Sequence, residues 1–256
     1  MESEIRAVLD RVEQKERVKV LYAVESGSRA WGFASVDSDW DVRFIYVQHP
    51  DWYLSVQRRR EVLEYPLSSK GLDVSGWDLR KALGLLAKSN PPLLEWLRSP
   101  IVYRETLSAA RRMRELSSRW FAPRSCMHHY LHMAEGNARD YLRGDPVWVK
   151  KYFYVLRPVL ACRWIEAHGT MPPTEFAALA ADRLPTALRA TVEALLRRKQ
   201  SGDELASGPR VPEISAFLDE ELGRLRATLT CTRGGDAPDW KQLDALFRDV
   251  LNEAWA

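Results

Sequence analysis

Residues 24–47 constrain the fold of this chain more than any other segment. From Asp39 onward the sequence alternates polar and apolar side chains as far as Arg43. Because successive side chains of a strand point to opposite faces, Asp39 and Asp41 lie on one face. The opposite face is apolar and consists of Trp40, Val42, Phe44 and Tyr46. The pattern predicts a strand that buries one face and holds two carboxylates side by side on the other.

The two neighbouring carboxylates indicate which kind of ligand this strand can bind. Like charges held together repel each other, which favours either a shared proton or a bound cation between them. Carboxylate oxygens are ligands for hard divalent cations rather than for zinc. We therefore expect a cofactor of Mg²⁺ or Mn²⁺ at Asp39 and Asp41.

A Gly-Ser pair precedes the carboxylates at the end of an apolar stretch, residues 18–24, that reads as a strand. Gly27 allows close approach of the backbone to a ligand, and backbone N–H groups at Gly27 and Ser28 suit a phosphate. Arg29 adds a fixed positive charge. Ten residues separate Ser28 from Asp39, enough to fold back over a ligand. Phosphate donors beside metal-binding carboxylates predict a site for a metal-complexed nucleoside triphosphate and in-line displacement.

The order and spacing of these residues resemble a known signature. Gly27-Ser28, ten residues and then Asp39-Trp40-Asp41-Val42 are similar to the motif of the DNA polymerase β superfamily of nucleotidyltransferases. The longer stretches resemble the RlaP-type family associated with RNA repair: ESGSRAWGF, SDWDVRFIYV, GWDLRKAL, SNPPLLEWL, HYLHMAEGNARDYLRG and KKYFYVLRPVLACRWIE. This resemblance implies transfer of NMP from an NTP to a hydroxyl acceptor, with release of pyrophosphate and with an RNA end as acceptor.

A third carboxylate is expected from the strand predicted over residues 72–76. Enzymes of the superfamily use such an acid on a neighbouring strand as the base for the attacking hydroxyl, and Asp73 has this position. Asp78 is the alternative, but it directly precedes a predicted helix over residues 79–86, where aspartate is a good N-cap. The sequence favours Asp73 as the third catalytic and metal-binding residue.

The chain divides into a half that contains both strands and helices and a half that contains helices only. A helix over residues 2–17 comes first, a further strand is predicted over residues 61–65, and residues 101–103 form either a final strand or a connector. After about Glu105 every periodic segment is helical, including long helices over residues 124–143 and 147–168. We expect an α+β protein with a polymerase-β-like nucleotidyltransferase α/β domain containing a mixed sheet (residues 1–105). An all-helical domain (residues 106–256) would follow and close the nucleotide cleft.

The second helical segment carries a basic and aromatic stripe. On a helix Lys150, Tyr154 and Arg157 share one face, and Lys151 lies on an adjacent stripe. The cations could contact the β and γ phosphates while Tyr154 stacks on the base. An ordinary solvated basic stripe is the alternative. The family resemblance favours a role in triphosphate binding, because a helical domain commonly completes such a site.

Composition indicates a protein of the cytoplasm. The 256 residues include 46% apolar residues and carry a net charge of +3, and no apolar run approaches the roughly 20 residues of a membrane span. Three separated cysteines form neither an even disulfide set nor a metal knuckle. His128 and His132 have the spacing of zinc ligands, but no matching Cys or acid completes a set, so they are expected to be ordinary core or surface residues.

Two other functions remain open at the level of sequence. One is nucleotidylation of a protein or small molecule, and a small-molecule acceptor predicts a closed acidic pocket. The other is a non-catalytic nucleotide sensor, which the intact carboxylates disfavour. An RNA acceptor instead predicts a continuous basic track. Its candidate residues are Arg58, Arg59, Arg60, Arg111, Arg112, Arg114 and Arg124.

Overall fold

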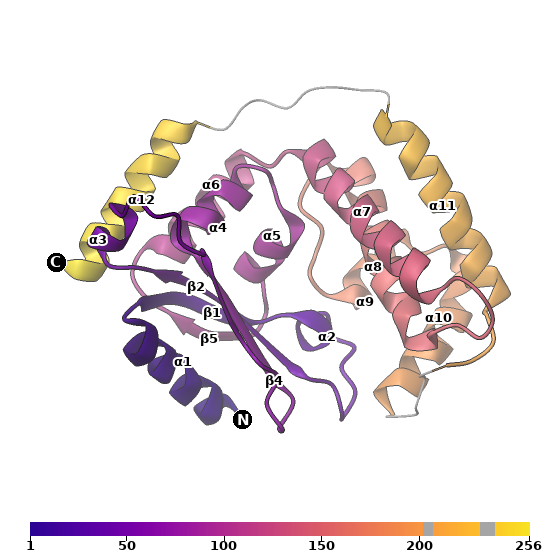
Figure 1. The fold of residues 1–256 in the computed structure, drawn as a ribbon. Coiled ribbons are helices and arrows are strands. Elements are labelled where there is room, and N and C mark those ends of the chain that lie inside the picture. Colours follow the sequence, from indigo (N-terminus) through magenta and orange to yellow (C-terminus); the bar gives the residue numbers. More distant parts are fainter. Residues whose placement is uncertain (202–206, 231–238) are drawn as a thin grey trace. The chain divides into compact units, whose positions relative to one another are not determined.

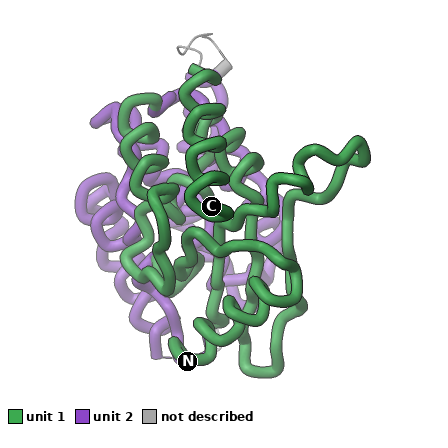
Figure 2. Tube along the Cα trace, turned by 90° about the vertical axis from the view of Figure 1, so that its left-hand side faces the viewer, with its two compact units in different colours: residues 1–30, 39–120, 237–256 green, residues 31–38, 121–236 purple. Residues whose placement is uncertain are grey.

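The computed structural model describes residues 1–201, 207–230 and 239–256, which form two compact units (Figures 1 and 2). The first unit comprises residues 1–30, 39–120 and 237–256, and the second comprises residues 31–38 and 121–236. This division differs from the predicted ranges 1–105 and 106–256. Two helices that follow residue 105 belong to the first unit, and the loop 31–38 belongs to the second.

A five-stranded mixed sheet with the order β3-β4-β2-β1-β5 forms the centre of the first unit. β2 and β4 are parallel, whereas the pairs β1–β2, β1–β5 and β3–β4 are antiparallel. The strands are β1 (Lys19–Glu25), β2 (Trp40–Val47), β3 (Val62–Tyr65), β4 (Leu72–Asp78) and β5 (Val102–Glu105). The predicted α+β class and mixed sheet are confirmed.

One face of the sheet packs against α1 (Glu2–Glu16), which lies below the sheet in Figure 1. The apolar side of α1 shares a core cluster with the alternating residues of β2. The members of this cluster from α1 and β2 are Ile5, Leu9, Val12, Val42, Phe44 and Tyr46. The predicted apolar face of β2 is therefore buried, and Asp41 on the opposite face is left for the site described below.

Helices cover the other face of the sheet. They are α4 (Leu79–Leu86), α5 (Pro91–Leu97), α6 (Ala109–Arg119) and α12 (Trp240–Trp255), with the short α3 (Pro50–Tyr53) beside α12. α12 comes from the end of the chain and joins this unit through an ion pair of 2.9 Å between Arg112 and Asp249 and through ring contacts of Phe247 with Tyr53. Because these contacts join residues more than 130 positions apart, local sequence patterns did not assign α12 to the sheet domain.

The second unit is built around α8 (Tyr152–His168), most of whose residues are buried. Its other helices are α7 (Pro123–Tyr141), the 3₁₀ turn η1 (Val149–Lys151), α9 (Phe176–Arg183), α10 (Thr186–Gln200) and α11 (Pro212–Thr230). The prediction of one helix over residues 147–168 is wrong at its start. Val147 forms an isolated bridge with Gly208, and residues 149–151 adopt the tighter 3₁₀ geometry before the α-helix begins.

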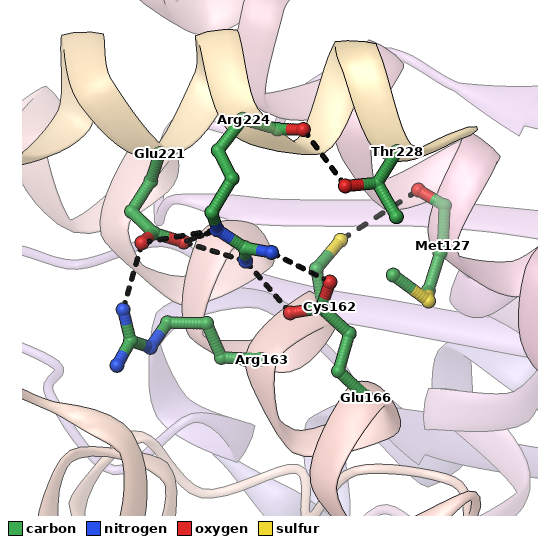
Figure 3. Close-up of polar contacts among 7 residues, drawn as sticks. All are labelled: Met127, Cys162, Arg163, Glu166, Glu221, Arg224 and Thr228. Atoms are coloured by element: carbon green, nitrogen blue, oxygen red, sulfur yellow. Dashed lines mark hydrogen bonds and ion pairs between the residues drawn. The ribbon is translucent and has the colours of Figure 1, made fainter. Parts of the chain in front are cut away.

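A charged network fixes α11 against α8 (Figure 3). The Arg224 guanidinium donates to both carboxylate oxygens of Glu166, at 2.8 and 2.7 Å, and also to Glu221. Arg163 completes the network with a bond of 2.8 Å to Glu221, whose side chain is nearly buried. Bidentate arginine–carboxylate pairs constrain orientation as well as distance, so this network sets which face of α11 meets α8.

The two cysteines in the described part of the chain are both buried free thiols, Cys126 and Cys162. The Cys162 thiol donates to the carbonyl of Met127 at 3.6 Å (Figure 3), and burial raises its pKa above the ordinary value. Such a thiol is protonated and unreactive near neutral pH. The third cysteine, Cys231, lies outside the described residues.

Residues 31–38 form part of the second unit because their aromatic side chains pack there. Phe33 is fully buried, with ring centroids 5.4 Å from Phe153 and 5.7 Å from Phe176. The buried Lys199 ammonium donates to the Phe33 carbonyl at 2.8 Å, and burial lowers the pKa of Lys199 to about 8. The segment between Ser28 and Asp39, which is long enough to fold back over a ligand, is thus anchored at its centre by contacts within the second unit.

Candidate active site

The parallel pairing of β2 with β4 brings Asp41 directly opposite Asp73. This confirms the prediction that the strand of Asp73 lies beside the strand of Asp41. At the start of the pair, the Trp40 amide donates to the Gly71 carbonyl at 2.7 Å, and Gly71 leaves space for the Asp39 carboxylate. A Cβ atom at Gly71 would lie 3.0 Å from Asp39 Oδ1. The three predicted carboxylates therefore lie at the same end of two adjacent strands.

Arg43 bridges two of these carboxylates. Its Nη2 atom lies 3.2 Å from Asp41 Oδ1 and 2.7 Å from Asp73 Oδ2, and Nη1 donates to the Asp73 carbonyl at 3.2 Å. The sequence analysis gave Arg43 no role. The available signal was its position two residues after Asp41, which places it on the same face of the strand.

Gly27 packs directly on Asp41. It begins the one-turn helix α2 (Gly27–Ala30) with φ +60°, and a Cβ atom there would lie 2.0 Å from Asp41 Oδ2. The backbone is held nearby, since the Ser26 amide donates to the Asp41 carbonyl at 2.8 Å. Only glycine permits this approach. The Gly-Ser turn and the carboxylate strand are thus brought together as the sequence predicted.

The other residues of the turn lie close to the same strand. Ser28 is nearly buried. Arg29 donates from Nε to the Asp39 carbonyl at 3.1 Å, and its guanidinium lies 3.8 Å from the centroid of the Trp40 ring. The positive charge of Arg29 is therefore held beside the first carboxylate by a stacking contact.

Glu25 supports Asp41 from the preceding strand and was also missed by the sequence analysis. Its fully buried carboxylate accepts a bond of 2.8 Å from the Asp41 amide and another from the Tyr103 hydroxyl. Burial raises the pKa of Glu25. A buried acid with two hydrogen-bond partners fixes the backbone of Asp41, and no short motif reveals this contact.

The electrostatics of the site favour an added cation. Burial raises the pKa of Asp41, the Arg43 charge opposes this effect, and the neighbouring Asp73 and Asp39 carboxylates reinforce it. The donor set is entirely oxygen, which fits Mg²⁺ or Mn²⁺. Within residues 1–201, 207–230 and 239–256, no three His, Cys, Asp or Glu side chains converge as a metal-binding group. The carboxylates fit a divalent cation chemically, and the Arg43 guanidinium lies between two of them.

The predicted stripe in the second unit does not form a single exposed face. Lys150 and Lys151 lie in η1, and the Lys151 ammonium lies 4.4 Å from the centroid of the Tyr154 ring. Burial lowers the pKa of Lys151, and the charge of Lys150 adds to the effect. Arg157 is only 1% exposed, donates to the Thr174 carbonyl at 3.0 and 3.2 Å, and lies over the Trp31 ring. Arg157 is thus held in internal contacts, whereas Lys150 is exposed.

A family model for the RNA repair pathway DNA polymerase beta family, RlaP, matches residues 1–249. The chain belongs to this family. It is accordingly a nucleotidyltransferase, as the Gly-Ser and Asp-x-Asp signature predicted.

Two individual proteins resemble this RlaP chain. The protein named "Uncharacterized protein YcgL" from Bacillus subtilis (strain 168) is 46% identical over 256 residues, covering 100% of this chain and 98% of the relative. The crystal structure of a nucleotidyltransferase-like protein from Exiguobacterium sibiricum 255-15 covers 97% of this chain and 75% of its own, at 12% identity and a TM-score of 0.34.

Asp78 has a structural role in this RlaP chain. It is fully buried, caps α4 by accepting from the Arg80 amide at 2.8 Å, and accepts from the Tyr53 hydroxyl at 2.6 Å. It pairs with Tyr46 in the β2–β4 ladder, five positions beyond the pair of Asp41 and Asp73. The N-cap interpretation of Asp78 is confirmed.

The Asp78 carboxylate is expected to make stability depend on pH. Burial raises its pKa from 3.8 to about 6, so the folded state binds this proton more tightly than the unfolded state. The contribution of Asp78 to the free energy of unfolding is therefore complete below pH 4 and falls by about 3 kcal/mol as pH rises through 6. Urea denaturation of wild type and Asp78→Asn across this range measures the effect, because asparagine also caps helices but does not titrate. A difference in stability that stays constant with pH would contradict the prediction.

Most arginines of the predicted basic track form ion pairs or hydrogen bonds with other residues of the chain. Arg111 pairs with Glu115, Arg112 with Asp249, and Arg114 with Glu105. Arg124 donates to the Leu229 carbonyl at 3.0 Å. Arg60 pairs with Glu64, whereas Arg58 and Arg59 have no ion pair within the described part of the chain. These two arginines are the members of the track that remain available to a ligand.

The sequence analysis also expected neither a membrane-spanning helix nor a metal site at the histidines. No helix in the described part of the chain combines the length and the apolar character that a bilayer span requires. His128 and His132 lie on α7, and His132 lies 3.8 Å from Glu135. They belong to no group of three potential metal ligands among the residues described.

Proposed function

We propose that this nucleotidyltransferase transfers NMP from an NTP to a hydroxyl acceptor in a reaction that depends on a divalent metal and releases pyrophosphate. The observation that supports this most directly is the pairing of Asp41 with Asp73 on parallel strands, with Gly27 packed against Asp41. A phosphate-binding turn and a carboxylate pair in contact provide the two halves of a metal-nucleotide site.

Each residue of the site has a proposed role. Asp39, Asp41 and Asp73 would hold Mg²⁺ or Mn²⁺, which when bound would neutralise phosphate charge and polarise the reacting phosphorus. Asp73 would also orient or deprotonate the acceptor hydroxyl. Because the amides of Gly27 and Ser28 are suited to phosphate, the turn would bind the triphosphate with help from the charge of Arg29.

Three residues of the second unit are also proposed to bind nucleotide. Lys150 and Lys151 are proposed to bind phosphate, and Tyr154 is proposed to stack on the base. Arg157 was expected to share this role, but its burial supports a different one, which is to hold Trp31 and the Thr174 carbonyl in place.

The acceptor we propose is an RNA end in an RNA-repair reaction of the cytoplasm. The description of the family, which names an RNA repair pathway, supports this choice. The rival acceptors are a protein or a small molecule, and a nucleotide sensor would have no acceptor.

The test is to incubate the protein with each α-³²P-labelled NTP and bulk RNA, bulk protein, small-molecule extract or no acceptor. Mg²⁺ and Mn²⁺ are compared with EDTA. Label that enters RNA only with a divalent metal is the expected result. Label on protein or on small molecules would transfer the assignment to that acceptor. Binding of NTP without transfer to any acceptor would favour the sensor, and failure to bind any metal-NTP would contradict the proposal as a whole.

A further inference from the structure

A second pocket in the first unit lies between α3 and the start of α4, and its lining includes Arg58 and Arg59 of the predicted basic track. Its volume is about 380 Å³. The aromatic and charged side chains that line it are Trp52, Tyr53, Arg58, Arg59, Glu61 and Arg80. Two aromatic rings and three arginines against one acid give the lining a positive charge and flat apolar surfaces.

Two of the three arginines of this pocket lie over its aromatic rings. The Arg80 guanidinium is 5.7 Å from the Trp52 ring centroid and 5.3 Å from that of Tyr53. Arg59 is 5.9 Å from Trp52. Arg80 also donates to Glu61 at 2.6 Å, whereas Arg58 and Arg59 have no such acid partner among the residues described. Two of the three positive charges are therefore available for an anionic ligand.

The inner wall of the pocket is rigid. The Tyr53 hydroxyl donates to the fully buried Asp78 at 2.6 Å and accepts from the Gln48 amide at 3.0 Å. The Tyr53 ring also lies edge-on to Phe247 of α12, with centroids 5.0 Å apart. Trp52, next to Tyr53 in α3, is partly buried and lies 5.1 Å from the Tyr53 ring. A ligand would meet an aromatic surface that is held in place before binding.

This pocket is separate from the candidate active site. Asp41 and Asp73 pair at one end of the β2–β4 ladder, and Tyr46 pairs with Asp78 at the other. The two pairs are five positions apart along the strand, which corresponds to about 17 Å. A single nucleotide at the carboxylates cannot also reach Trp52, so the pocket would hold a different part of a longer molecule or a separate ligand.

We propose that this pocket binds a nucleotide of single-stranded RNA at a distance from the reacting end. The base would stack on Trp52 beside Arg59, and Arg58 would contact the phosphate. Aromatic side chains combined with arginines are the usual means by which proteins hold unpaired bases and their backbone. The choice of RNA as the ligand rests on the proposed function, whereas the preference for a stacked anionic ligand comes from the lining itself.

The test measures RNA affinity by fluorescence anisotropy with a labelled single-stranded RNA of roughly 12 nucleotides. Trp52→Ala is expected to weaken binding by about 5- to 150-fold, the range for loss of one stacked base. Arg58→Ala is expected to lower the slope of log affinity against log salt by about one. Arg60→Ala is the matched control, because Arg60 is in the same segment but pairs with Glu64 and does not line the pocket. Trp52→Phe, which keeps an aromatic ring, is expected to restore most of the affinity.

Several results would overturn this proposal. They are no binding of RNA by the wild type, equal binding by wild type and Trp52→Ala, or an equal loss in Arg60→Ala. Competition by an acidic peptide but not by unlabelled RNA would assign the pocket to a protein partner instead. Asp41→Asn should lose NMP transfer but retain RNA binding at the pocket. RNA binding by the wild type without any NMP transfer would contradict only the proposed function.

Discussion

Asp41→Asn is expected to lower the rate of NMP transfer by more than about 100-fold. Loss of a residue that merely supports a metal ligand commonly costs about 10- to 100-fold in metal affinity or activity, so loss of a ligand should cost more. Asparagine is similar in size but removes the negative charge that attracts the cation and pairs with Arg43 at 3.2 Å. Initial rates with labelled NTP measure the transfer, and electron paramagnetic resonance of Mn²⁺ measures metal binding independently.

Asp37→Asn is the control for the loss of one acidic charge. Asp37 is exposed in the segment before the carboxylate strand and has no ion pair within the part of the chain that is described. Its variant is expected to keep both activity and Mn²⁺ binding close to those of wild type. If Asp41→Asn retained more than about a tenth of the wild-type rate, Asp41 would not be a ligand of the catalytic metal.

Gly27→Ala is expected to reduce activity by about 100-fold or more even though it adds a single methyl group. The new Cβ atom would lie 2.0 Å from Asp41 Oδ2, so the two atoms must move apart by at least about 1 Å. A displacement of this size at a reacting centre can cost about 100-fold. Steady-state kinetics should show a fall in kcat/KM, and Mn²⁺ affinity should fall with it because the carboxylate itself is displaced.

Gly27→Ala has two effects, backbone strain at a positive φ and a steric clash of the new Cβ atom with Asp41, and a second variant separates them. Gly27 and Gly32 both have positive φ, +60° and +79°, but a Cβ atom at Gly32 would meet nothing within 4 Å. Both alanine variants should therefore lose about 1 kcal/mol of stability in denaturation experiments. Only Gly27→Ala should lose activity. A similar loss of activity in Gly32→Ala would indicate that strain rather than the contact with Asp41 is responsible.

In the first unit, the predictions that were confirmed are those that depend on local sequence patterns. Alternation in residues 39–46 gave the buried face of β2, because a strand has a side-chain period of two whatever its surroundings. Asp78 was recognised at a helix start, and its side chain accepts a bond from the Arg80 amide of the following helix. Asp73 was preferred over Asp78 on the same grounds, and the register of β4 places Asp73 opposite Asp41.

The contacts that surround Asp41 depended on the tertiary structure. Glu25 and Arg43 reach it from β1 and from further along β2, and each is an ordinary polar residue of a strand until the pairing of strands is known. The packing of Gly27 against Asp41 likewise joins residues fourteen positions apart.

By itself, the sequence determined the α+β class, the strands that carry the carboxylates, and the nucleotidyltransferase signature. These features arise from periodicity, capping and short motifs, all of which act over a few residues. Only the tertiary structure decided that α12 packs beside the sheet, that residues 31–38 belong to the helical unit, and that Arg157 is buried. Each of these outcomes depends on the packing of apolar side chains against residues far away in the sequence. A short stretch of sequence does not specify such contacts, because many distant residues could bury the same side chain equally well.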